Sequence, residues 1–157
     1  MDYYSQIAEG YDELHSQEQL AKLKVVKEKI KDEGLVLDIG SGTGLSRHFF
    51  RYVVQLDPSL ALLKNSEGMR VCAVAEYLPF KDHVFDVIIS VTSLHHTNIK
   101  KVVPEIKRVS KPGASFAFSI LKSSKDFKRI VSLLEEGFIL EKVELDKDLV
   151  LVCERNS

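Results

Sequence analysis

The sequence predicts one α/β domain: a three-layer sandwich around a seven-stranded, mostly parallel sheet that ends in an antiparallel hairpin. Short apolar segments alternate with amphipathic ones, which is typical of βαβ units. Several of the apolar segments are continuous, as expected of strands covered on both faces. The last two segments are joined only by Asp146-Lys147-Asp148, too few residues for a crossover helix, so they must pair antiparallel.

The individual elements follow from apolar spacing and from glycine and proline punctuation. Helices are expected over residues 16–31, 99–109 and 124–136, with shorter ones from about Gly44 and from Pro58. Strands are expected over residues 35–39, 52–56, 70–75, 84–91, 114–121, 138–145 and 149–154. The lysines of the first helix should form a solvated face; they are Lys22, Lys24, Lys27, Lys29 and Lys31.

Composition sets the broad class of the protein. The net charge of -1 gives no global attraction to nucleic acid. The chain has no apolar run of about 18 residues and no signal-like start, so we expect a cytoplasmic protein that does not bind membranes. Cys72 and Cys153 lie in apolar segments and are expected to be small core residues, and no spacing of His or Cys predicts a metal site.

A glycine-rich turn carries the strongest functional signal. Gly40, Gly42 and Gly44 follow an expected strand and precede an expected helix. Glycine adopts backbone angles that other residues avoid, and it lets the chain approach a ligand closely. Asp57, at the end of the next strand, can accept hydrogen bonds from both hydroxyls of a ribose. The turn and this acid indicate a ligand that contains a nucleoside.

Two further residues distinguish S-adenosylmethionine (SAM) from a dinucleotide. Leu45 stands where the dinucleotide motif has its third glycine. Asp38 lies two residues before the first glycine, where its carboxylate would repel a pyrophosphate and attract the ammonium group of a methionine moiety. The charge pattern therefore favours SAM.

A series of segments also resembles a known family. Residues 35–44 (Leu-Val-Leu-Asp-Ile-Gly-Ser-Gly-Thr-Gly) look like motif I of the class I SAM-dependent methyltransferases, and the later segments resemble the type 11 methyltransferase group. The match covers about residues 3–120 and implies a Rossmann-like fold. The later segments are residues 56–59 (Leu-Asp-Pro-Ser), 75–80 (Ala-Glu-Tyr-Leu-Pro-Phe), 85–90 (Phe-Asp-Val-Ile-Ile-Ser), 94–96 (Leu-His-His) and 105–113.

The resemblance implies a set of cofactor-binding residues. These are Tyr11, Asp38, Gly40, Ser41, Gly42, Asp57, Pro58, Ala75, Glu76, Tyr77 and Ser90. By the resemblance, Asp38 would bind the amino group, Asp57 the ribose and Glu76 with its neighbours the adenine. Ser90 and the residues after it would lie near the sulfonium, and Tyr11 would belong to an element that closes over the cofactor. Val74 departs from the family, because many relatives have an acid there that accepts from the adenine amino group.

The domain organisation and the acceptor complete the sequence-based hypothesis. Residues 1–157 should form one SAM-dependent methyltransferase domain, with residues 1–33 as a helical cover and residues 34–157 as the Rossmann-like core. His95, at the end of the fourth strand, is the candidate general base, with a scaffold role as the alternative.

The chain offers little covering structure beyond its N-terminal segment, so the acceptor site should be open or be completed by a second copy or a partner subunit. A small-molecule acceptor is favoured. The alternatives are an RNA or protein acceptor, and a SAM-binding subunit without catalysis of its own.

Overall fold

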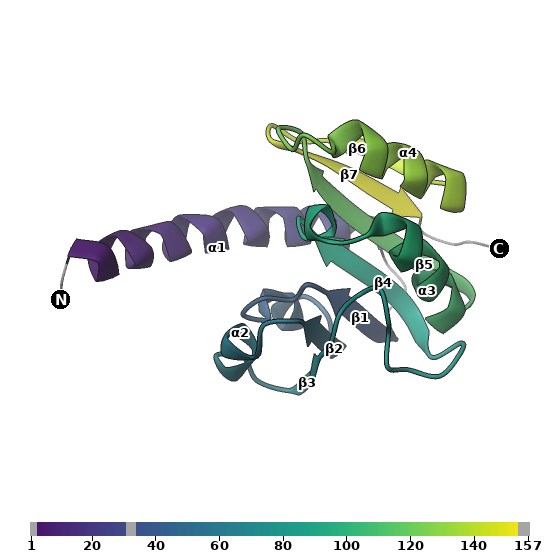
Figure 1. Ribbon diagram of the computed structural model, residues 1–157, viewed down its shortest axis with the longest axis horizontal. Helices are drawn as coiled ribbons and strands as arrows, with labels where there is room; N and C mark the ends of the chain where they lie inside the picture. The colour runs from purple at the N-terminus through teal and green to yellow at the C-terminus, as the bar shows by residue number, and fades with distance from the viewer. Residues whose placement is uncertain (1–2, 31–33, 154–157) are drawn as a thin grey trace.

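The fold is a seven-stranded sheet between layers of helices (Figure 1). The computed structural model describes residues 3–30 and 34–153, with side chains from residue 13 onward. The strand order is β3-β2-β1-β4-β5-β7-β6; β1 to β5 are parallel, and β7 pairs antiparallel with β5 and β6. This confirms the predicted fold class. The strands are β1 (Leu35–Ile39), β2 (Tyr52–Asp57), β3 (Met69–Cys72), β4 (Phe85–Val91), β5 (Ser110–Leu121), β6 (Glu141–Glu144) and β7 (Asp148–Cys153).

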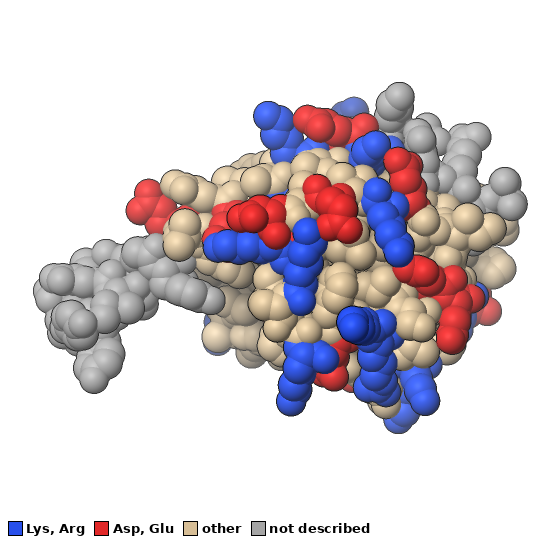
Figure 2. Space-filling model, turned by 90° about the horizontal axis from the view of Figure 1, so that it is seen from above, with Lys and Arg blue, Asp and Glu red and all other residues tan. Residues whose placement is uncertain are grey.

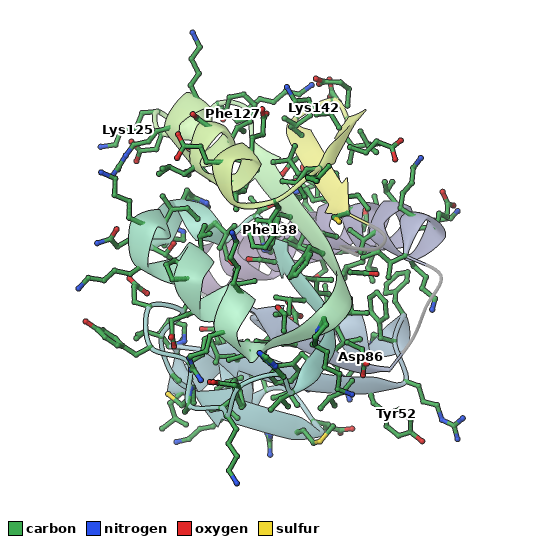
Figure 3. The ribbon with its side chains drawn as sticks, turned by 90° about the vertical axis from the view of Figure 1, so that its right-hand side faces the viewer. Tyr52, Asp86, Lys125, Phe127, Phe138 and Lys142 are labelled. Atoms are coloured by element: carbon green, nitrogen blue, oxygen red, sulfur yellow. The ribbon has the colours of Figure 1, made fainter. Side chains whose placement is uncertain are left out.

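Helices cover both faces of the sheet. They are α1 (Tyr3–Lys29), α2 (Leu60–Lys64), α3 (Ile99–Val109) and α4 (Phe127–Gly137), with one-turn 3-10 helices η1 (Leu45–His48) and η2 (Leu94–His96). The apolar side chains of α1 share one core cluster with one sheet face, and those of α3 and α4 share a second cluster with the other face. Phe138, just after α4, packs on Phe116 of β5 with ring centroids 4.6 Å apart (Figure 3).

Alternation along the strands places the site residues. In β1, Val36 belongs to the cluster on the α1 side, whereas Leu37 and Ile39 belong to the opposite one. Asp38 shares the face of Val36, because side chains alternate along a strand. It therefore lies on the α1 side of the sheet. Tyr52 and Asp86 lie at the other end of the strands, where β2 and β4 begin (Figure 3).

Several element boundaries differ from the predicted ones. The helix expected after Gly44 is only the single turn η1, because the chain must enter β2 at Tyr52. The helix expected from Pro58 begins at Leu60, with Ser59 as its N-cap. The first helix extends back to Tyr3, and its N-terminal part runs past the edge of the sheet in Figure 1. The strand at residues 35–39 and the helix at residues 99–109 have the predicted limits, and the other strands and helices start or end within a few residues of theirs.

Two individual residues contradict the sequence-based interpretation. Lys22, expected on a solvated face, is only 8% exposed because it lies four residues before buried Val26 on the inner side of α1. Cys72, expected in the core, is exposed because it ends the edge strand β3, whereas Cys153 is buried as expected. Within residues 3–30 and 34–153, no helix is both long and apolar enough to cross a membrane.

Candidate functional site

A cavity of about 420 Å³ lies where the carboxyl ends of β1, β2 and β4 meet α1. This volume lies within the range of small-ligand sites, about 300–1,000 Å³. The carboxyl ends of parallel strands are also where open α/β sheets bind ligands. The cavity therefore has the size and the place of a cofactor site.

The glycine turn forms one wall of the cavity. The backbone N–H groups of Gly40 and Ser41 both donate to the Leu56 carbonyl, at 2.8 and 3.0 Å, which ties the turn to β2. A Cβ on Gly40 would collide with the side chain of Ser93, so only glycine fits there. Gly42 has a φ of 58°, and a Cβ there would meet no atom within 4 Å. The backbone of Gly42 thus faces open space that a ligand can enter.

Asp57 lies across the turn, at the end of β2. Its Oδ2 accepts from the Gly42 N–H at 2.9 Å and its Oδ1 accepts from the Ser59 N–H at 2.8 Å. These bonds fix the carboxylate plane at the cavity wall. A carboxylate has about four acceptor positions, so each oxygen keeps one for a ligand hydroxyl.

Asp38 supplies a second acid to the cavity. Burial raises the pKa of Asp38 to about 7, and the nearby Asp57 carboxylate raises this pKa as well. The Ser46 hydroxyl donates to Asp38 Oδ2 at 2.5 Å, which opposes part of the increase in pKa. A buried carboxylate of this kind binds a cation favourably, because the cation replaces the lost hydration.

The opposite wall comes from α1 and from the end of β4, regions that the sequence analysis expected near the cofactor without naming these side chains. Its lining residues are His15, Ser16, Gln19, Leu23, Val91, Thr92, Ser93 and His96. The α1 residues could have been found from their helical spacing, since Ser16, Gln19 and Leu23 share one side of the helix. Ser93 falls within the residues after Ser90 that the resemblance implies near the sulfonium, but its packing against Gly40 depends on the left-handed backbone of Thr92 before it.

The two adjacent histidines take different positions. His96 is exposed and lines the cavity, whereas His95 is part-buried and does not. Their ring centroids are 3.8 Å apart. Burial lowers the pKa of His95, and the neighbouring His96 lowers it further. His95 is therefore neutral at pH 7 and able to accept a proton.

The structure brings together five of the predicted cofactor residues around the cavity: Asp38, Gly40, Ser41, Gly42 and Asp57. The remaining predicted residues with described side chains lie apart from this lining. Ser90 is fully buried and donates to the Ile39 carbonyl behind the turn. Ala75 is buried in the core and Pro58 is exposed.

The two predicted adenine neighbours are engaged with α3. Glu76 accepts from the Asn98 N–H at 3.1 Å, and the Tyr77 hydroxyl accepts from Lys101 at 3.1 Å. Val74, the departure from the family pattern, is 43% exposed. The side chain of Tyr11 lies outside the described residues.

Known proteins share the pattern and the fold. A family model described as a methyltransferase domain matches residues 37–118. An uncharacterized protein of Methanocaldococcus jannaschii is 34% identical over 143 residues, which cover 87% of this chain and 57% of that protein. The ubiquinone/menaquinone biosynthesis C-methyltransferase of Wigglesworthia glossinidia brevipalpis is 37% identical over 109 residues, which cover 57% of this chain and 43% of that protein. The chain thus spans about half the length of these curated relatives.

A solved structure from Methanococcus maripaludis has the same fold. It is described as a candidate S-adenosyl-L-methionine-dependent methyltransferase and matches with a TM-score of 0.74 at 17% identity. The match covers 96% of this chain and 92% of that one.

Proposed function

Because the chain belongs to the class I SAM-dependent methyltransferases of the type 11 group, we propose that its cavity binds SAM between Asp38 and Asp57. The observation that carries this proposal is the pair of acids on either side of an open glycine turn. Asp38 suits the ammonium group of the methionine moiety, and Asp57 suits the ribose hydroxyls. The backbone at Gly42 leaves room for the ligand between them.

The described side chains fit this cofactor better than a dinucleotide. Asp38 and Asp57 give the cavity wall a negative character, which opposes a pyrophosphate and favours a ligand with a positive charge. The η1 turn after the glycines is too short to offer the helix N-terminus on which dinucleotide sites rely. Adenine would then lie beyond Asp57, toward Leu62 and Asn65, which line that part of the cavity.

When bound, SAM supplies a methyl group on a positively charged sulfur. The protein's own residues then have to orient the two reactants and exclude water, which accounts for much of the rate in transfers of this kind. The α1 residues Gln19 and Leu23 close one side of the cavity. His96 stands at its border, and the neutral His95 behind it could take a proton from an acceptor hydroxyl or amine.

A small molecule is the acceptor that we favour. The cavity is a defined pocket with α1 as a wall, which suits a compact ligand beside the cofactor. Over the upper part of the face that Figure 2 presents, Lys and Arg side chains are interspersed with Asp and Glu, so that part offers no uniform positive field for a polyanion, whereas basic side chains gather along its lower edge. The similar C-methyltransferase of ubiquinone/menaquinone biosynthesis is named for a small-molecule pathway.

A methyl-transfer assay tests both levels of the proposal. The protein is incubated with SAM that carries a labelled methyl group and, separately, with small-molecule, RNA and protein fractions of a cell extract. Label in the small-molecule fraction, reduced with Asp57→Ala at SAM concentrations near the wild-type Kd, is the expected result. Label in RNA or protein alone would refute the acceptor class. Calorimetry that detects no SAM binding by the wild-type protein would refute the cofactor site.

A further inference from the structure

A buried ion pair links α1 to β7 next to the cavity. Lys22 Nζ lies 3.1 Å from Asp148 Oδ1, and the two side chains are only 11% and 1% exposed. The same ammonium group donates to Gln19 Oε1 at 3.1 Å and to Thr92 Oγ1 at 2.8 Å. All three of its N–H groups therefore have an acceptor, as a buried ammonium requires.

Thr92 is the centre of this network. Its hydroxyl must donate to Asp148 Oδ2, 2.9 Å away, because an ionised carboxylate can only accept. It follows that Thr92 accepts from Lys22 and from the Ser119 hydroxyl, which lies at 2.9 Å. The Thr92 backbone N–H also donates to the Ser119 carbonyl at 3.0 Å. Strands β5 and β7 and helix α1 thus all hold the one residue.

The backbone of Thr92 needs this support. Its φ is 53°, in the left-handed region that a β-branched residue rarely adopts. Residues in such conformations persist only where the surrounding structure holds them, and they gather at functional sites.

Thr92 directs the next residue against the glycine turn. Ser93 Oγ donates to the Ile39 carbonyl at 2.9 Å, and its side chain fills the space beside Gly40. Both Thr92 and Ser93 line the cavity. A continuous set of contacts therefore runs from α1 through Thr92 and Ser93 to the turn.

We propose that Lys22 and Asp148 are positioning residues for the cofactor site, and that they act by holding Thr92 in its left-handed conformation. Thr92 in turn keeps Ser93 against Gly40, so the wall of the cavity is already formed when the ligand arrives. This inference rests on the proposed SAM site. Neither Lys22 nor Asp148 lines the cavity, so their effect on binding must pass through their neighbours.

A second ion pair on the same helix provides the matched control. Lys147 Nζ lies 3.1 Å from Glu18 Oε1, and it joins α1 to the turn before β7. This pair is more exposed and does not contact Thr92. Its removal therefore tests whether loosening α1 alone affects the site, without any change in the contacts that hold Thr92.

The test measures SAM affinity by calorimetry on variants of the full chain. Lys22→Met/Asp148→Leu removes both charges together, which avoids a lone buried charge and tends to preserve stability. We expect SAM affinity to fall at least about tenfold in this variant. Adding Thr92→Gly should bring affinity back to within about threefold of wild type, because glycine adopts a positive φ without strain. The control variant Glu18→Gln/Lys147→Met should bind SAM as wild type does.

Each contrary result overturns a stated part of the inference. Wild-type SAM affinity in Lys22→Met/Asp148→Leu overturns the positioning role of the two residues. If adding Thr92→Gly does not restore affinity, the idea that Lys22 and Asp148 act through Thr92 is overturned. If the double variant does not fold, Thr92→Val takes its place as the test, because it keeps both charges and removes only the hydroxyl. The SAM affinity of Thr92→Val should also fall about tenfold, and an unchanged affinity overturns the inference. Absence of SAM binding by wild type would instead refute the proposed function.

Discussion

Lowering the pH from 7 to 6 should weaken SAM binding about fivefold, through protonation of Asp38. The pKa of this carboxyl is raised to about 7 by burial and by Asp57, so about half of the molecules carry the charge at pH 7 and about a tenth at pH 6. If the ammonium group of SAM binds only the ionised form of Asp38, the apparent SAM affinity is proportional to the fraction of molecules in which Asp38 is ionised. An α-amino group has a pKa of about 7.7–8.0, so the ligand stays mostly cationic over this range.

Isothermal titration calorimetry measures the affinity and the proton release together. Titrations at pH 7 in two buffers of different ionisation enthalpy should show release of about half a proton per SAM bound, because binding shifts Asp38 to its ionised form. Two histidines, His15 and His96, also line the cavity. Asp38→Asn is therefore the control: it should bind more weakly and lose most of the pH dependence.

The reasoning is refuted if wild-type affinity is equal at pH 6 and 7 and no proton is released. It is also refuted if Asp38→Asn keeps the full pH dependence, since a group other than Asp38 would then be responsible.

Three further predictions concern the same turn. Without ligand, the free energy of unfolding should fall as the pH rises from about 4 to 7, because the folded state keeps the Asp38 proton that the unfolded chain loses. The difference between a pKa of 3.8 in the unfolded chain and about 7 in the folded protein corresponds to a fall of at most about 4 kcal/mol. Urea denaturation should show a smaller fall for Asp38→Asn than for the wild type. Asp57→Ala should weaken SAM binding by about 1–3 kcal/mol, and an unchanged calorimetric affinity would remove Asp57 from the site. Gly40→Ala should lower the melting temperature more than Gly42→Ala. Both positions have a positive φ, which costs alanine about 1–2 kcal/mol, but only at Gly40 does the added methyl group also meet the Ser93 side chain. Equal decreases in melting temperature would contradict this packing.

The sheet was predictable because its signals are local. Each signal, whether a continuous apolar strand, the glycine turn or the short link at residues 146–148, spans only a few consecutive residues. The strand directions then follow from the rule that short links make antiparallel pairs and long ones make parallel pairs. The terminal hairpin appears as expected, with Glu144 paired to Leu149.

The grouping of Asp38, Gly40, Gly42 and Asp57 around the cavity was also predictable, because these residues belong to two consecutive strand ends. The contacts that form the opposite wall were not. Thr92 and Ser93 take their positions from Lys22 and Asp148, which lie 70 and 56 residues away in the sequence. Lys22 is one of several lysines in the first helix, so its residue type did not indicate that it would be buried. Its place four residues before Val26 was the one local indication of it.

The adenine end remains a prediction of the resemblance. Glu76 and Tyr77 contact α3 and lie apart from the cavity lining, whereas Leu62 and Asn65 line it next to Asp57. The resemblance pointed to Glu76 and Tyr77, and the sequence analysis did not name Leu62 or Asn65.

The central claim is that the cavity between α1 and the glycine turn holds the methyl donor. A crystal structure of the protein with S-adenosylhomocysteine tests this most directly. The account predicts that the ribose hydroxyls donate to Asp57 and that the amino group of the ligand faces Asp38. A ligand bound outside this cavity, or one whose amino group points away from Asp38, would contradict it.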